Sequence, residues 1–153
     1  MFVEVFIIKY AWGNTNLHKD WLSPSSKGKT GKLYKAFIKY VQTSMNYLVS
    51  KNYDVKIAGM CWMQGESDSF SIENANSYKD NLINFTNDIR RKFSSYAAKN
   101  GIVFVDAYIA ANPLYWVYCD IVNQKKFVNM ILTYVFCIDA IVKASTRLLI
   151  CFD

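Results

Sequence analysis

The chain has 153 residues, of which 52% are hydrophobic and 20% are charged. This balance is typical of one globular domain with a buried core, and it excludes a disordered chain. The formal net charge is +6. Its densest cluster, Lys27, Lys29 and Lys32, has no interleaved aromatic residues, so we interpret it as a solvated loop and expect no nucleic-acid partner.

Cysteine spacing and hydropathy narrow the class of protein further. The four cysteines show no C-x-x-C spacing, so we expect neither a metal site nor a disulfide framework. Gly28-Lys29-Thr30 imitates the end of a phosphate-binding loop, but Ser23 stands where the first glycine belongs, so we expect no nucleotide cofactor. The apolar stretch 127–138 is shorter than the ~20 residues that span a bilayer, and we expect no membrane segment.

In the first half of the chain, a strand, a loop, a helix and a strand are predicted in that order. Residues 2–8 read as a buried strand, and the polar stretch 14–31 reads as a long loop of the kind that is often functional. A helix follows, because apolar residues recur at its spacing: Tyr34, Phe37, Ile38, Val41, Met45 and Leu48. The apolar run 55–63 is typical of a strand that is covered on both faces.

The second half of the chain continues the alternation. A second helix carries Tyr78, Leu82, Phe85, Ile89 and Phe93, and we expect Asn100-Gly101 to end it. A strand at 102–108, a helix at 117–130 and a fourth strand at 131–138 follow, while 148–152 is either a short strand or a frayed end. Such alternation predicts a parallel sheet with right-handed crossovers.

The most informative stretch is Cys61-Trp62-Met63-Gln64-Gly65-Glu66-Ser67-Asp68. It places an amide, a turn glycine and two carboxylates where a buried strand ends, and ligands of α/β sheets collect at such ends. This junction is where chemistry would sit, but the residues alone leave a polar turn at a strand end open as the simpler reading. Ser67 and Asp68 are expected to cap the next helix rather than to do chemistry, and His18 is expected to be solvated.

Two motifs together resemble the sialate O-acetylesterase and acetylxylan esterase family, a branch of the SGNH-type hydrolases. They are Lys9-Tyr10-Ala11-Trp12-Gly13-Asn14-Thr15-Asn16-Leu17, followed by Asp20-Trp21, and Gly59-Met60-Cys61-Trp62-Met63-Gln64-Gly65-Glu66-Ser67-Asp68. The resemblance implies an α/β fold, a three-layer α/β/α SGNH-hydrolase-like (flavodoxin-like) parallel sheet. It also implies a serine hydrolase that removes acetyl groups from sugar hydroxyls, with an acetylated carbohydrate as its partner. We predict a partial domain at 1–139 and a divergent tail at 140–153.

The resemblance assigns roles to individual residues at the two strand ends. It implies that the Gln64 side chain and a backbone N–H near Gly13 form the oxyanion hole, with Glu66 holding the loop. Glutamine is a neutral donor, and glycine lets the backbone approach a small acyl group. Asn14 replaces a second glycine, which predicts a narrower hole or a left-handed backbone. Trp12 and Trp21, together with Asn14, are expected to contact the sugar, while Trp62 is at least as well explained by core packing.

The sequence lacks the motifs that carry catalysis in this family. Family members hold the serine nucleophile in a Gly-Gln-Ser-Asn motif and the acid and base in an Asp-x-x-His motif, whereas the only histidine here is His18. We therefore predict a domain that is incomplete at both ends and inactive by itself. The alternatives are a glycan-binding pseudoenzyme without catalysis and a nonfunctional fragment.

Overall fold

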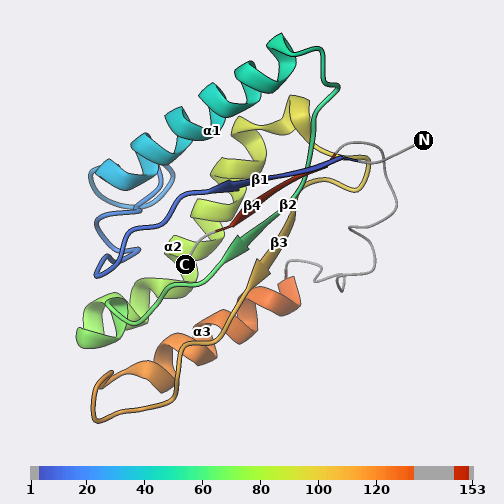
Figure 1. The fold of residues 1–153 in the computed structure, drawn as a ribbon. Coiled ribbons are helices and arrows are strands. Elements are labelled where there is room, and N and C mark those ends of the chain that lie inside the picture. Colours follow the sequence, from blue (N-terminus) through green and yellow to red (C-terminus); the bar gives the residue numbers. More distant parts are fainter. Residues whose placement is uncertain (1–3, 133–146, 152–153) are drawn as a thin grey trace.

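A computed structural model of the chain describes residues 4–132 and 147–151. Within these residues one parallel sheet is formed by β1 (Val5–Lys9), β2 (Lys56–Trp62), β3 (Val103–Asp106) and β4 (Arg147–Cys151). The strand order across the sheet is β1-β4-β2-β3 (Figure 1). The predicted mixed α/β architecture with a parallel sheet is therefore confirmed.

The centre of the sheet is filled by β4, the last described strand. It pairs in parallel with β1 on one side and with β2 on the other, and Leu149 lies in register with Ile7 and with Gly59. Of the two readings of 148–152, the short strand is thus correct. The two strands that carry the sequence motifs, β1 and β2, are therefore not direct neighbours, because β4 separates them.

The first helix, α1 (Lys32–Ser50), follows the predicted pattern. Its buried side chains recur every three or four residues, so they form one stripe against the core: Tyr34, Phe37, Val41, Met45 and Leu48. The backbone N–H of Gly31 bonds to Leu22 O at 2.8 Å. A side chain at Gly31 would lie 2.1 Å from the carbonyl oxygen of Asp20, so only glycine fits at this entry to the helix.

The second and third helices are α2 (Ile72–Lys92) and α3 (Cys119–Leu132). Ser71 begins α2, and its hydroxyl accepts the N–H of Asn74. Phe93 caps the C-terminus, and the 3₁₀-helix η2 (Ser94–Tyr96) follows, so α2 ends well before Asn100-Gly101, contrary to our prediction. The predicted strand at 131–138 begins inside α3, and its remainder lies outside the described residues.

One face of the sheet carries the packed core. Trp62 of β2 packs on Phe85 of α2 with ring centroids 4.5 Å apart, and Asp106 of β3 bonds to Lys126 of α3. Side chains alternate along a strand, so the odd positions of β1 point to the other face. There Val5 and Ile7 are 56% and 65% exposed. At these two positions the sheet therefore presents apolar side chains to solvent.

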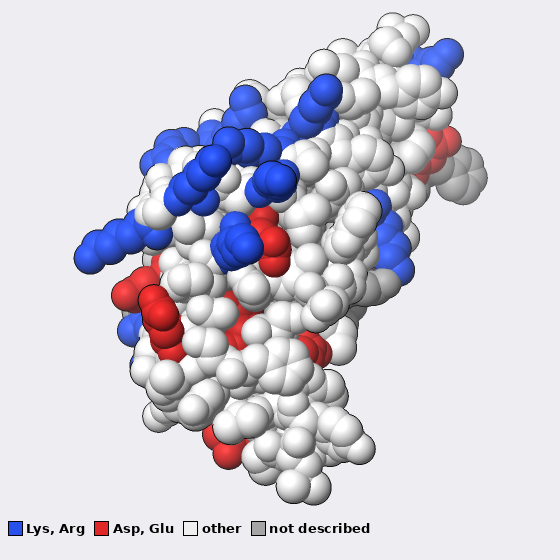
Figure 2. Space-filling view, turned by 90° about the vertical axis from the view of Figure 1, so that its left-hand side faces the viewer, with Lys and Arg blue, Asp and Glu red and all other residues white. Residues whose placement is uncertain are grey.

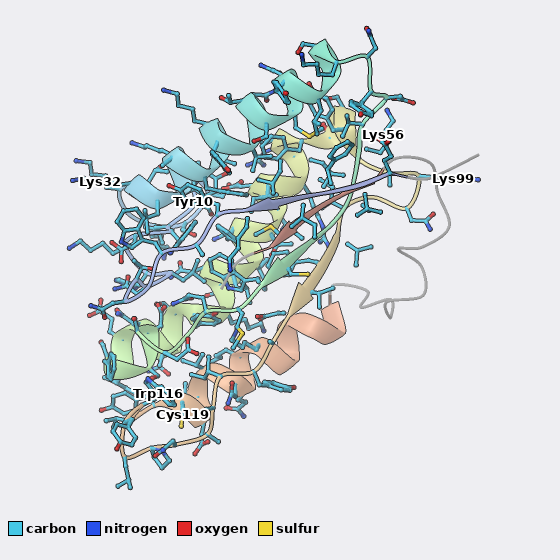
Figure 3. All side chains as sticks on the ribbon, in the orientation of Figure 1. Tyr10, Lys32, Lys56, Lys99, Trp116 and Cys119 are labelled. Atoms are coloured by element: carbon cyan, nitrogen blue, oxygen red, sulfur yellow. The ribbon has the colours of Figure 1, made fainter. Side chains whose placement is uncertain are left out.

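The strands all run toward the same end of the molecule. Tyr10 after β1 and Trp116 before α3 lie at this end, whereas Lys56 and Lys99 lie at the opposite one (Figure 3). Figure 2 looks onto the end with Tyr10 and shows Lys and Arg gathered on its upper part, with few charges below. Lys27, Lys29 and Lys32 are exposed.

The domain boundary predicted at 139 lies outside the described residues.

No helix in the described part of the chain is both long and apolar enough to cross a membrane.

Candidate active site

The candidate site begins where β2 ends at Trp62. Gly65 has a φ of +146°, which side chains rarely allow, and a Cβ there would lie 2.9 Å from Val122 Cγ1 of α3. This glycine lets the chain turn tightly against α3 immediately after the strand. The turn leads into the 3₁₀-helix η1 (Asp68–Phe70). The carboxylate of its first residue, Asp68, lies at the candidate site.

Asp68 is the hydrogen-bonding centre of the site. Its carboxylate accepts the backbone N–H of Leu17 at 2.8 Å and of His18 at 3.1 Å. It also accepts the Gln64 side-chain amide at 2.6 Å. Our prediction that Asp68 caps the following helix is therefore wrong: Ser71 does so, and Asp68 instead joins the loop after β1 to the loop after β2.

Burial governs the ionisation of Asp68. The residue is 0% exposed. Burial raises the pKa of its carboxyl to about 6, although the hydrogen bonds from Gln64, Leu17 and His18 favour the charged form. The carboxylate therefore takes up a proton in mildly acidic solution, and this weakens its hold on three donors.

Gln64 is fixed by both ends of its amide. Its Nε2 donates to Thr15 O at 3.0 Å as well as to Asp68, and its Oε1 accepts the Tyr78 hydroxyl at 3.3 Å. The side chain is only 9% exposed. The contact with Thr15 brings the two sequence motifs together although their strands are separated by β4.

Tyr78 of α2 helps to hold Gln64 in place through hydrogen bonds. Its hydroxyl donates to the backbone oxygen of Gln64 at 2.7 Å and accepts the Trp62 indole N–H at 3.3 Å. Burial, followed by the charges of Asp106 and Asp68, raises the pKa of Tyr78 well above its usual value. The phenol therefore stays protonated and acts as a donor at physiological pH.

A buried ion pair lies next to this tyrosine. Lys126 Nζ of α3 is 2.6 Å from Asp106 Oδ1 at the end of β3, and the two side chains are 0% and 2% exposed. The ammonium also lies 5.4 Å from the centre of the Tyr78 ring. Among the described residues no group donates to Asp106 Oδ2. Burial lowers the pKa of Lys126 and raises that of Asp106, and their mutual attraction opposes both shifts.

The loop after β1 presents an open surface. Gly13 has no atom within 4 Å of the position of a Cβ, and Trp12 is 64% exposed. Asn14 has a φ of 57°. The left-handed backbone predicted at Asn14 is therefore present, as one of the two expected consequences of replacing a glycine.

The aromatic residues expected to contact a sugar differ in exposure. Trp21 is 2% exposed, its ring lies 5.5 Å from that of Trp62, and its indole N–H bonds to Thr15 Oγ1 at 2.9 Å. Trp21 is therefore buried under the loop after β1. Of these two tryptophans, Trp12 is the one that faces solvent. Trp62 is also 2% exposed, in agreement with core packing.

The remaining polar candidates have structural partners. The backbone oxygen of Glu66 accepts the Ser69 N–H at 3.1 Å and the Ser69 hydroxyl at 2.7 Å, so Glu66 takes part in the turn through its main chain. Ser67 precedes η1 without a capping hydrogen bond from its side chain. His18 is half-buried rather than solvated, because its Nδ1 lies 3.0 Å from Ser77 Oγ.

The geometry thus defines a rigid polar wall at the carboxyl end of β2. Gln64, Asp68 and the loop that carries Gly13 are brought together, while His18 turns away toward α2. Among the described residues, no cluster of three or more His, Cys, Asp or Glu is placed to hold a metal ion.

Sequence reasoning missed the Asp106–Lys126 pair and the role of Asp68. One signal was present for the pair: Asp106 interrupts an apolar strand near its end, at the edge of the sheet where ligands collect. Lys126 carried no such signal, because a lysine within a helix is usually solvated.

A parallel α/β sheet with polar groups at the carboxyl ends of its strands is a frequent framework of enzymes. The sequence model of the family described as carbohydrate esterase, sialic acid-specific acetylesterase, matches residues 2–147. This match covers most of the chain, so the chain belongs to that family. A search of curated proteins and a search of solved structures each find no match.

Proposed function

We propose that the chain is a carbohydrate O-acetylesterase-type domain of the serine hydrolase class that recognises an acetylated sugar and does not hydrolyse it by itself. The observation that carries this proposal is the 3.0 Å hydrogen bond from Gln64 Nε2 to Thr15 O. It joins the two strand ends at which the polar groups gather. Membership of the carbohydrate esterase family supports an acetylated sugar as the ligand.

In this proposal Gln64 and Gly13 form the wall that faces the acetyl group. The acyl oxygen replaces Thr15 O as the acceptor of one Gln64 N–H, while Asp68 keeps the other and holds the amide in place. The open space beside Gly13 admits the acetyl methyl group. Trp12 and Asn14, which are exposed on the same loop, contact the sugar ring.

The proposed lack of turnover rests on the residues present. A serine hydrolase needs a serine, a base and an acid in hydrogen-bond sequence. The chain contains neither a Gly-Gln-Ser-Asn nor an Asp-x-x-His motif. Its only histidine, His18, bonds to Ser77 on α2. An oxyanion wall without the triad supplies roughly 10³- to 10⁴-fold acceleration at most.

The fold that we propose for the family domain is the three-layer SGNH-type arrangement. It requires helices on both faces of the sheet, including the face that carries Val5 and Ile7. The exposure of these two apolar side chains, at 56% and 65%, supports the idea that this face is built to be covered.

The proposal is tested by titrating ¹⁵N-labelled protein with a methyl glycoside that carries one O-acetyl group, and with the same glycoside without it. We expect at least fivefold tighter binding of the acetylated form, and Gln64→Ala should abolish this preference. Gln42→Ala is the matched control, since that amide donates to Asn46 Oδ1 within α1 at 3.0 Å, away from the candidate site. Equal binding of the two glycosides by folded protein contradicts the proposal.

A further inference from the structure

A polar groove with a volume of about 710 Å³ lies between α2 and the loop that follows β1. Its helical wall comes from side chains three, four or seven residues apart, which the helix places on one face. These are the polar residues Glu73, Ser77, Asp80, Asn81 and Asn84, together with one apolar residue, Ile83. The volume falls within the roughly 300 to 1,000 Å³ of small-molecule sites.

Both walls of this polar groove are held in place by hydrogen bonds. Across it, His18 Nδ1 lies 3.0 Å from Ser77 Oγ. Farther along the loop, Ser25 donates its N–H and its hydroxyl to Asp88 at 2.9 and 2.7 Å. A groove with fixed walls loses little conformational entropy when it takes up a ligand.

The hydrogen-bond partners of His18 and Ser77 decide which of their atoms carry the protons. The Ser77 hydroxyl donates to Asn74 O at 3.1 Å, so its oxygen accepts from the imidazole. The proton of a neutral His18 therefore lies on Nδ1, and Nε2 remains an acceptor. Asn81 adds a further bond to the Ser77 oxygen at 3.4 Å.

The lining of the polar groove indicates what kind of ligand fits. Glu73 and Asp80 contribute two negative charges and Lys27 one positive charge, which gives a net charge of −1 and disfavours an anion. Amides, carboxylates, hydroxyls and an imidazole offer donors and acceptors in similar measure. No Phe, Tyr or Trp is among the described residues that line the groove, so hydrogen bonds rather than stacking on a large aromatic ring hold the ligand.

We propose that the polar groove is a second binding site, which takes a neutral carbohydrate through its hydroxyl groups. It deepens the proposed function and rests on it, because the groove would hold sugar units that carry no acetyl group. The two sites share a loop: the backbone N–H groups of Leu17 and His18 bond to Asp68, which also bonds to Gln64. A sugar against His18 thus contacts the loop that positions Gly13.

The test uses xylohexaose, a neutral oligosaccharide without acetyl groups, and ¹⁵N-labelled protein made in bacteria. We expect amide signals of residues around Ser77 and Asn84 to shift on titration. Asn84→Ala should weaken binding at least fivefold, whereas the matched control Asn76→Ala, on the exposed side of the same helix, should leave it within twofold. Gln64→Ala should also leave the affinity within twofold.

Three outcomes overturn the proposal: no shifts in folded protein, equal binding by the Asn84→Ala and Asn76→Ala variants, or weakening by Gln64→Ala as strong as that by Asn84→Ala. Tighter binding of a galacturonic acid hexamer than of xylohexaose contradicts the neutral class of ligand. If xylohexaose binds through Asn84 while the acetylated glycoside shows no preference, the proposed function fails and the polar groove stands.

Discussion

Asp68 shows how one buried carboxylate can organise a site through neutral donors. Its three donors among the described residues are two backbone N–H groups and one side-chain amide, all neutral. Hydrogen bonds to a charged acceptor contribute about 1.5 to 3 kcal/mol each, and here they offset part of the cost of burying the charge. The raised pKa indicates that burial outweighs them.

This balance predicts a pH dependence for Asp68→Asn. Because the pKa is about 6 in the folded protein and 3.8 in the reference state, the folded state binds the proton more tightly. Protonation therefore adds stability as the pH falls from 7 toward 5, by about 1 kcal/mol. The asparagine variant cannot gain it, so the difference in unfolding free energy between wild type and variant should widen by that amount.

Urea unfolding of both proteins at pH 7 and pH 5 measures this difference, in which effects of other titrating groups largely cancel. We expect the variant to be less stable at both pH values, since an amide cannot accept from all three donors. A difference that stays constant, or narrows at pH 5, contradicts the role assigned to Asp68.

The buried ion pair predicts a non-additive pair of substitutions. Lys126→Met leaves Asp106 charged and unpaired in the interior, which should cost about 3 to 5 kcal/mol of unfolding free energy. The double variant Lys126→Met with Asp106→Leu removes both charges and should recover most of that loss. A double variant that unfolds at the same urea concentration as the single variant shows that the pair is not coupled.

At the scale of elements, β4 holds the sheet together, because β1 and β2 pair with it rather than with each other. A central strand cannot accept proline, which lacks the N–H and costs about 3 kcal/mol or more. Leu149→Pro should therefore abolish cooperative unfolding, as followed by circular dichroism. Leu149→Ala keeps the N–H and serves as the control; similar midpoints for the two variants refute a central position of β4.

The helices and three of the strands could be predicted from sequence because their patterns are local. The stripe from Tyr34 to Leu48 identifies α1, and the apolar run ending at Trp62 identifies β2. Strand order could not be predicted in this way, since it depends on which strands pair across the chain. The prediction for 131–138 was wrong at Ile131 and Leu132 because an apolar run fits a helix as well as a strand.

The candidate site was predicted in part for a similar reason. Gln64 and Gly13 are marked by motifs at strand ends, and the left-handed Asn14 follows from replacing a glycine. The burial of Trp21 and the partners of Asp68 could not be predicted, because they depend on contacts with residues about 40 and 50 positions away, such as Trp62 and Leu17. Such contacts leave no local pattern.

At the scale of the whole molecule, the face of the sheet that carries Val5 and Ile7 predicts self-association through apolar contact. Ile7→Thr keeps a β-branched residue but removes apolar surface, so it should lower the dimer fraction in sedimentation velocity. Val49→Thr is the matched control, because Val49 is 48% exposed on α1. Equal association of both variants and wild type counts against self-association through this face of the sheet.

We propose that the chain carries the acetyl-binding wall of a carbohydrate esterase without the groups that complete catalysis. This proposal is tested most directly by measuring p-nitrophenol release from p-nitrophenyl acetate with folded wild-type protein and the Gln64→Ala variant. We predict that any acceleration by wild type stays within the roughly 10³- to 10⁴-fold that an oxyanion wall supplies without a triad, and that Gln64→Ala removes it. Acceleration well beyond that range would reveal a nucleophile within this chain, and the proposed lack of a complete catalytic apparatus would then be wrong.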